Sequence, residues 1–274
     1  MLRDITLGQY YQADSVIHRL DPRVKLGTTI LFIISLFVFD DIWGYAVAAF
    51  FLTLVIKLSK VPFQFMVKGM KSIVFLLSVT VIFNLFLTPG EPVVSIWKLT
   101  ITAEGLRLAV LLAIRLGFLI IGSSAMTLTT TPNQLTDGLE KMLKPLGKIK
   151  VPVHEIAMMM SIALRFIPIL MEETDKIMKA QLARCADFES GNLIKKAKSL
   201  VPLLVPLFIS AFRRANDLAM AMEARCYRGG EYRTKMKPLH YEKRDYIAYA
   251  IVLCYLVAGC AAEKLIPLLL KGIV

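Results

Sequence analysis

The sequence predicts an all-α integral membrane protein with about five transmembrane helices and a cytoplasmic or interfacial domain of two or three long helices. The chain has 274 residues, of which 56% are hydrophobic, and its mean hydropathy is +0.61. A soluble core does not need so much apolar surface. The chain nevertheless carries a net charge of +12, which is typical of basic loops between membrane spans.

Five apolar runs are expected to cross the membrane as helices. A polar lead-in, residues 1–25, precedes them, and within it Pro22 suits an early position of the first helix. No cleavable signal peptide is visible. Asp40-Asp41 alone separates the first two runs, which therefore predict a tight helical hairpin. The expected spans are residues 26–39, 42–56, 72–88, 105–128 and 246–270.

The distribution of cations predicts the orientation in the membrane. Four lysines with no acid between them follow the second span: Lys57, Lys60, Lys68 and Lys71. The next loop, residues 89–103, contains one lysine and an interfacial Trp97. By the positive-inside rule the lysine loop is cytoplasmic and the Trp97 loop is outside. We therefore expect a multi-pass protein with a cytoplasmic N-terminus and its C-terminus outside.

Arg115 lies near the middle of the fourth expected span. A charge at that depth costs roughly 2.5 to 3.5 kcal/mol on insertion scales, so its side chain should face protein or water rather than lipid. A structural partner for Arg115 is favoured over a role in transport.

The charge pattern divides the chain into three parts. Residues 1–128 form a membrane domain, residues 129–245 form a cytoplasmic domain, and residues 246–274 form the fifth span and a tail. The middle part holds 20 of the 33 Lys and Arg residues and 13 of the 21 acids, a net charge of +7. Within it, residues 133–150 predict one amphipathic helix that lies on membrane lipid. Internal prolines are expected to bend the two longer helices that follow.

These two longer segments end alike. A shift of 41 residues superimposes Ala183-Arg184-Cys185 on Ala224-Arg225-Cys226. Each arginine could simply complement a helix dipole, which contributes a few tenths to about 1 kcal/mol. The repetition favours a second interpretation, in which each guanidinium binds a carboxylate of a partner through two hydrogen bonds. Two such tips then predict two similar binding sites on partner proteins, here called sockets.

Several other chemistries have no matching motif. Residues 138–148 lack the spacing of a phosphate-binding loop, so the chain is not expected to be an ATPase. Residues 40–41 lack the second acidic cluster that a prenyl-transfer enzyme needs. His18, His154 and His240 are far apart, so neither a metal site nor a cofactor is expected. The basic stretches lie beside spans without interleaved aromatics, which argues against nucleic acid as a partner.

Five motifs in this order resemble those of the transmembrane T component of energy-coupling factor (ECF) transporters. They are residues 15–25 (SVIHRLDPRVK), 129–132 (TTTP), 164–168 (LRFIP), 180–184 (AQLAR) and 221–225 (AMEAR). The family usually carries glycine directly after Ala-Arg, whereas this chain carries Cys185 and Cys226. Glycine can stop a helix through its access to positive φ, which cysteine adopts less easily.

The resemblance implies a prokaryotic cell-membrane scaffold with no catalytic residue of its own. It would couple two similar but non-identical cytoplasmic ABC ATPases to a membrane-embedded S component that captures a vitamin or another micronutrient. The ATPase-docking residues would be Ala183, Arg184, Cys185, Ala224, Arg225 and Cys226. Methionine suits surfaces that accept several partners, so exchangeable S components would contact Met158, Met159 and Met160.

Other interpretations stay open at this point. The three methionines could be ordinary core residues. The chain could be a dedicated T component of a single cobalt, nickel or biotin uptake system. It could also be a self-contained secondary transporter, which should show an inverted repeat and broken helices with ionisable groups at mid-membrane.

Overall fold

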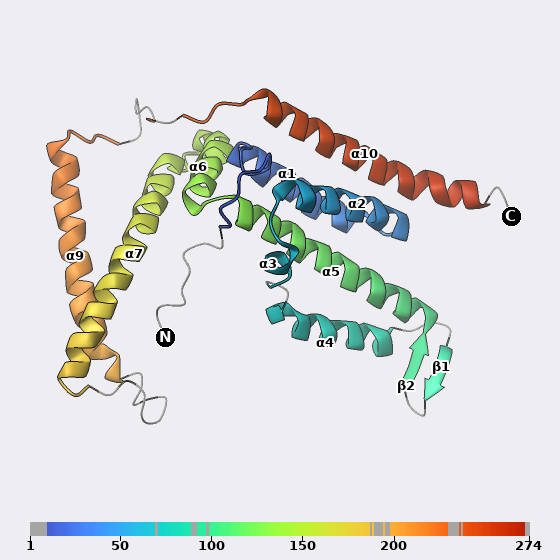
Figure 1. Ribbon diagram of the computed structural model, residues 1–274, viewed down its shortest axis with the longest axis horizontal. Helices are drawn as coiled ribbons and strands as arrows, with labels where there is room; N and C mark the ends of the chain where they lie inside the picture. The colour runs from blue at the N-terminus through green and yellow to red at the C-terminus, as the bar shows by residue number, and fades with distance from the viewer. Residues whose placement is uncertain are drawn as a thin grey trace. The chain divides into compact units, whose positions relative to one another are not determined.

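The computed structural model describes residues 10–68, 71–88, 92–96, 99–186, 188, 194, 198–229, 236 and 238–271 (Figure 1). The chain falls into two compact units. The bundle unit contains Gly8–Leu139 and Leu239–Val274, and the arm unit contains Glu140–Pro238. The chain thus leaves the bundle unit once and returns to it once.

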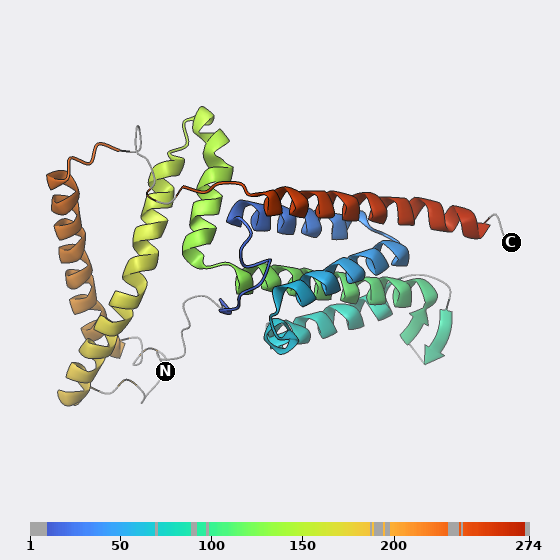
Figure 2. The same ribbon diagram turned by 45° about the horizontal axis from the view of Figure 1, so that its top comes forward.

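Four helices lie side by side in the bundle unit, and α4 (Lys71–Leu87) packs against one of them, α5 (Ala103–Thr129), as both ribbon views show (Figures 1 and 2). Capping explains where two of them begin. The Asp21 side chain accepts a hydrogen bond from the backbone N–H of Arg23, and Thr102 accepts one from the N–H of Gly105. The four helices are α1 (Pro22–Val38), α2 (Ile42–Ser59), α5 (Ala103–Thr129) and α10 (Lys243–Lys271).

The regular elements are helices, as the sequence predicts, apart from one short β-hairpin among the described residues. Between the short α3 (Phe63–Lys68) with α4 (Lys71–Leu87) and the start of α5, the chain forms β1 (Pro92–Ile96) and β2 (Leu99–Thr102). The two strands pair antiparallel, and their valine, isoleucine and threonine content favours this extended backbone. The segment had been expected as a plain outside loop. Trp97 lies outside the described residues.

Four of the described helices are long and apolar enough to cross a membrane. Three of them, α2, α5 and α10, coincide with expected spans. The other two expected spans form α1 and α4, which have 17 residues each, the lower end of the length that spans a bilayer. The fourth candidate is α7 (Val153–Ala183), which had been expected in the cytoplasmic domain. Its second half carries charges, among them Glu172, Asp175 and Lys179.

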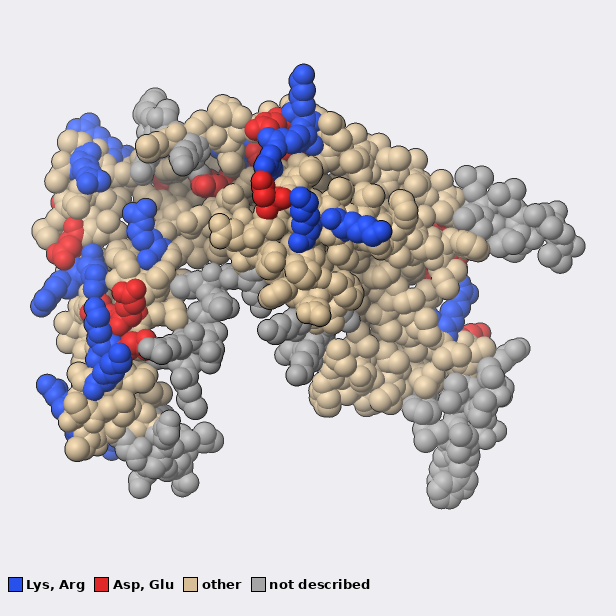
Figure 3. All heavy atoms as spheres, in the orientation of Figure 1, with Lys and Arg blue, Asp and Glu red and all other residues tan. Residues whose placement is uncertain are grey.

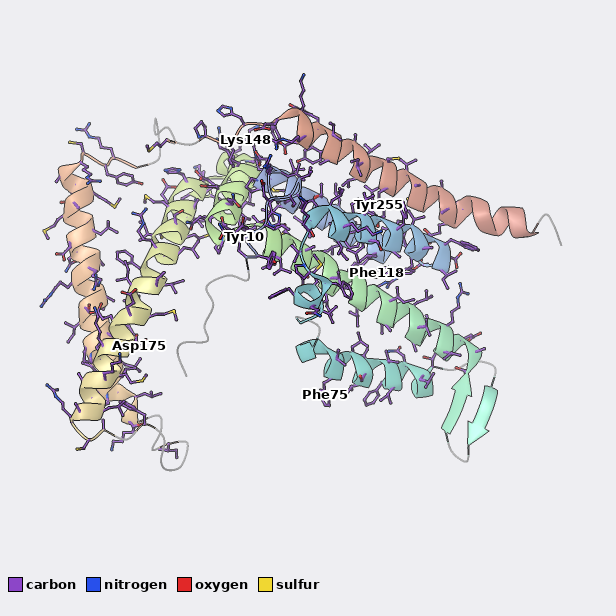
Figure 4. The ribbon with its side chains drawn as sticks, viewed as in Figure 1. Tyr10, Phe75, Phe118, Lys148, Asp175 and Tyr255 are labelled. Carbon is purple, nitrogen blue, oxygen red and sulfur yellow. The ribbon has the colours of Figure 1, made fainter. Side chains whose placement is uncertain are left out.

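Proline divides the amphipathic segment expected over residues 133–150. It forms α6 (Pro132–Leu143) and then the 3-10 helix η2 (Lys144–Ile149). Pro145 lacks a backbone N–H and cannot continue the α-helical hydrogen bonds, so the expectation of a single helix was wrong. In η2 the apolar Leu146 and Ile149 are 40% and 76% exposed, and Lys148 lies between them in the sequence (Figure 4).

Aromatic side chains fill the core of the bundle unit. Tyr255 of α10, labelled in Figure 4, stacks on Phe51 of α2 with ring centroids 4.4 Å apart. Its hydroxyl lies 2.7 Å from Ser35 Oγ of α1. A buried tyrosine needs such a polar partner, so this contact fixes how α10 sits against α1 and α2.

Arg115 faces protein, as expected for a guanidinium in a membrane helix. Its Nε donates to the Tyr45 hydroxyl at 2.7 Å, and its Nη2 donates to the Phe39 carbonyl at 3.0 Å. Phe39 is the residue that caps the C-terminus of α1, so Arg115 satisfies a carbonyl that the helix leaves free. These contacts are the structural partners that the sequence favoured.

A buried ionic network, here called the clamp, consists of Asp21, Arg23, Lys25 and Asp245. Asp245 is 2% exposed, and its carboxylate accepts the backbone N–H of Asp21 at 2.9 Å and that of Glu242 at 2.8 Å. Arg23 donates to both oxygens of the Asp21 carboxylate, at 3.0 and 2.7 Å. Because a buried carboxylate is stable only where donors replace water, Asp245 holds the start of α10 against the chain entering α1.

Lys25 extends the clamp to α5. Its buried ammonium donates to the carbonyls of His18 at 3.0 Å and Thr129 at 2.8 Å, and Thr129 is the last residue of α5. Burial keeps the pKa of the neighbouring His18 imidazole below its usual value. The chain leaves for the arm unit after α5 and returns from it before α10. The clamp therefore fastens both connections to the arm unit.

The clamp makes a prediction about stability. Replacement of Asp245 by alanine leaves the buried Asp21 N–H and the part-buried Glu242 N–H without their charged acceptor, so we expect a loss of about 3 to 5 kcal/mol. Thermal unfolding of the purified chain in detergent measures this loss. Asp217→Ala, a change of the same type at an exposed residue, should change the stability by less than about 0.5 kcal/mol. Equal midpoints for the two variants would contradict the assigned role of the clamp.

Candidate functional site: two arginine tips on crossed helices

Both predicted tips lie in the arm unit, at the ends of α7 and α9 (Val201–Ala224). The two helices run antiparallel and cross (Figures 1 and 2). Near one end of the pair, Gln181 Nε2 of α7 donates to the Pro202 carbonyl of α9 at 3.3 Å. Near the other end, Ile162 of α7 and Met222 of α9 line one cavity of about 300 Å³. The C-terminal tips of the two helices therefore lie at opposite ends of the pair.

A charged contact joins the helices between these ends. Arg214 of α9 donates to Glu173 of α7, with Nη2 and Nε 2.7 and 3.2 Å from Glu173 Oε2. Ser210 donates to the other carboxylate oxygen. Glu173 and Arg214 are 41 residues apart, which is also the shift that superimposes the two tips. In an antiparallel pair of related segments, equivalent positions meet where the helices cross, so Glu173 and Arg214 mark the crossing point.

The two tips have the same cap geometry. At the end of α7, the Ala186 N–H donates to the Gln181 carbonyl at 3.0 Å and the Cys185 N–H to the Leu182 carbonyl at 3.0 Å. At the end of α9, the equivalent bonds join Tyr227 to Met222 at 3.0 Å and Cys226 to Glu223 at 2.8 Å. These pairs of bonds define the Schellman motif. The repeat seen in the sequence is thus also a repeat of backbone structure.

Cysteine occupies the glycine position of both motifs. Cys185 has φ +62° and Cys226 has φ +56°, so both are in the left-handed conformation. The helices end directly before them, with Arg184 and Arg225 as the C-cap residues. Cysteine thus ends these helices as glycine would, although a side chain in this conformation costs roughly 1 to 2 kcal/mol. Strain of this kind is often found at functional positions.

The tip arginines differ from the other arginines considered above. Arg184 and Arg225 are exposed, and neither guanidinium has a partner among the residues that the structure describes. Arg23, Arg115 and Arg214 all donate to protein oxygens. Exposed guanidinium groups at the negative ends of helices are suited to bind an external acceptor.

The three methionines lie in the first turns of α7, far along the helix from Arg184. Val153 and Ala157 on the same turns are buried, whereas Met159 and Met160 are 57% and 41% exposed. Met158 is half-buried. Because the helices are antiparallel, these methionines belong to the end of the pair that carries Arg225.

Sequence reasoning did not identify Glu173 and Arg214. The signal was present, because the two residues are related by the same 41-residue shift as the tips. Their charges are opposite, so a search for identical residues passes over them. Glu173 is also one of three acids within residues 172–175, so its type and position do not single it out in the sequence.

The strained cysteines lead to a prediction. Cys185→Gly and Cys226→Gly remove the side-chain strain but add glycine's entropy cost, for a net gain of about 0.5 to 1 kcal/mol at each cap. Hydrogen exchange of the capping N–H groups of Ala186 and Tyr227 should slow accordingly, by about twofold to fivefold. Valine at either position should speed it, because a β-branched residue fits positive φ poorly. Valine variants that exchange as slowly as the glycine variants would contradict the cap assignment.

Comparison with known proteins agrees with these features. The family model described as cobalt transport protein (CbiQ) matches residues 13–236. The energy-coupling factor transporter transmembrane protein EcfT of Clostridium kluyveri is 58% identical over 262 residues, covering 95% of this chain and 96% of the relative. EcfT of Thermosediminibacter oceani is 56% identical, covering 90% and 94% of the two chains. EcfT of Bacillus subtilis is 47% identical, covering 89% and 93%. The chain therefore belongs to the EcfT family of energy-coupling factor transporter transmembrane proteins.

Proposed function

We propose that this chain is the coupling subunit of its transporter. In this proposal it carries motion from two cytoplasmic ATPases to a substrate-binding S component and has no catalytic residue of its own. The observation that supports the proposal best is the pair of identical arginine tips at opposite ends of two crossed helices. If both tips bound at one common site, they would not need to lie at opposite ends of the helix pair.

The length of the helices favours two separate sockets. α9 has 24 residues and an α-helix rises 1.5 Å per residue, so about 36 Å separate its two ends. The tip of α7 lies beside the start of α9, and the tip of α9 lies at its other end. Two arginines so far apart are suited to two subunits, each presenting an acid or helix-end carbonyls to one guanidinium.

The cap motif suits docking. Ala183 and Ala224 precede the arginines and have small side chains, so a socket wall can approach the helix closely. Cys185 and Cys226 turn the chain away at the helix end, so each arginine is the C-cap residue of its helix. The docking residues in this proposal are the ones expected from the sequence, which are Ala183, Arg184, Cys185, Ala224, Arg225 and Cys226.

The crossing suggests how the motion would be transmitted. If ATP binding changes the distance between the two sockets, the tips follow, while Glu173 and Arg214 hold the crossing point. The angle between α7 and α9 then changes, as in other rigid-body transitions. The start of α7, with the exposed Met159 and Met160, would move with it against the S component. Met158 belongs to the same turns and completes the proposed contact.

The alternatives from the sequence differ in what they require. A secondary transporter needs ionisable groups free to act at mid-membrane, whereas Arg115 is engaged by Tyr45 and by the Phe39 carbonyl. A dedicated cobalt, nickel or biotin component differs from the proposal only in its partner. Identification of the membrane subunits that co-purify with the chain distinguishes a dedicated component from a shared one.

Charge reversal at the tips tests the docking role. Arg184→Glu with Arg225→Glu should release both ATPases and abolish uptake, while the chain still inserts in the membrane at normal abundance. A single alanine at either tip should weaken assembly by about 2 to 5 kcal/mol, the cost of truncating one partner of a buried charged pair. Pull-down of the ATPases and uptake by whole cells measure the two effects.

Exposed cations near each tip provide matched controls. Lys179→Ala and Arg228→Ala remove the same charge at exposed positions, and exposed pairs contribute roughly 0 to 1 kcal/mol, so they should be nearly silent. Lys196 would be a further control, but it lies outside the described residues. The docking role is wrong if the variant with both Arg184→Ala and Arg225→Ala assembles with both ATPases and transports at the native rate.

Thiol labelling tests the orientation with the N-terminus in the cytoplasm. In a background free of cysteine, Glu104→Cys should react with an impermeant thiol reagent in intact cells, whereas Lys60→Cys should react only after lysis. Both native side chains are exposed, so access of the reagent decides the result. Ser59, the neighbour of Lys60, is not used as a labelling position because it is fully buried. The reverse labelling pattern would overturn the orientation.

A further inference from the structure

We propose that the bundle unit binds one anionic phospholipid in a groove between α1, α2, α5 and α10. The groove has a volume of about 180 Å³. Apolar side chains dominate its walls, among them Phe32, Leu52, Val55, Ala248 and Ile251. This inference does not depend on the coupling role.

The occupant of the groove has to be apolar and thin. Three of its lining residues, Leu58, Ile247 and Ile251, are 43%, 58% and 43% exposed, and α2 and α10 are both long enough to span a bilayer. The groove is therefore open to membrane lipid. A helix with side chains is at least 10 Å wide, whereas an acyl chain is only as wide as one methylene group. An acyl chain fits where a partner helix does not.

One end of the groove carries two basic side chains. Lys25 and Arg244 both line it, at the end of the unit where α1 and α10 begin, and Figure 3 shows Lys and Arg there together with Asp and Glu. The Lys25 ammonium is already committed to two carbonyls. Arg244 is paired with Glu242, but its side chain remains 42% exposed. Arg244 is thus the residue placed to bind a lipid phosphate.

The combination of an apolar groove and a basic end identifies the class of lipid. Basic pockets between transmembrane helices bind anionic headgroups, and each Lys or Arg near the headgroup improves binding by about fivefold. A guanidinium can also hold two phosphate oxygens at once. The acyl chain would lie along α2 and α10, with the phosphate at Arg244.

Native mass spectrometry of the full chain in detergent tests the site. The chain is titrated with phosphatidylglycerol and with phosphatidylcholine of the same acyl chains. We expect one tightly retained phosphatidylglycerol, bound at least about fivefold more tightly than phosphatidylcholine. Arg244→Gln should remove this preference. Arg107→Gln, which removes an equal charge from a residue paired with Asp41 and absent from the groove lining, should leave the preference intact.

A second pair of variants tests the groove itself. Ala248 lines the groove, whereas Ala250 is exposed on the same helix and does not line it. Ala248→Phe should abolish tight retention of phosphatidylglycerol, and Ala250→Phe should not. The proposal is overturned if Arg244→Gln binds like Arg107→Gln, or if Ala248→Phe retains the lipid normally. It is also overturned if glycerol 3-phosphate, a headgroup without chains, competes as well as the whole lipid.

Discussion

The contact between Glu173 and Arg214 is the interaction on which the arrangement of the arms depends. It joins equivalent positions of two related segments, and it lies where the antiparallel helices cross. If both positions carried the same charge, the contact would be repulsive. Opposite charges at equivalent positions therefore let two copies of one segment form an asymmetric pair with a defined crossing point. The positions of both tips follow from this point and from the helix lengths.

Features encoded locally could be predicted from the sequence. The two tips were found because Ala-Arg-Cys repeats within short segments, and most spans were found because they are continuous apolar runs. The φ of Cys185 and Cys226 was harder to predict, because intrinsic preference argues against positive φ for cysteine. The hydrogen bonds of the Schellman motif outweigh that preference. The hairpin β1–β2 was missed because its proline and glycine signals are also typical of a loop.

Features that depend on distant pairs could not be predicted in the same way. Asp245 stands before an apolar run and looks like an ordinary acid in the first turn of a helix. Its burial depends on the backbone N–H of Asp21, 224 residues earlier. α7 presents the opposite difficulty, because its length and apolarity match a membrane span while its tip carries the proposed docking residues. Composition alone does not separate these two uses of a helix.

The clamp also has a consequence for synthesis of the chain. Asp21 and Lys25 emerge early from the ribosome, and Lys25 can reach Thr129 as soon as α5 is made. Asp245 emerges only after the entire arm unit, because the residues that close the network are 224 positions apart. Until Asp245 is synthesised, Arg23, Lys25 and the Asp21 N–H lack the Asp245 carboxylate that completes the network. Closure of the clamp therefore requires that the arm unit has already been synthesised.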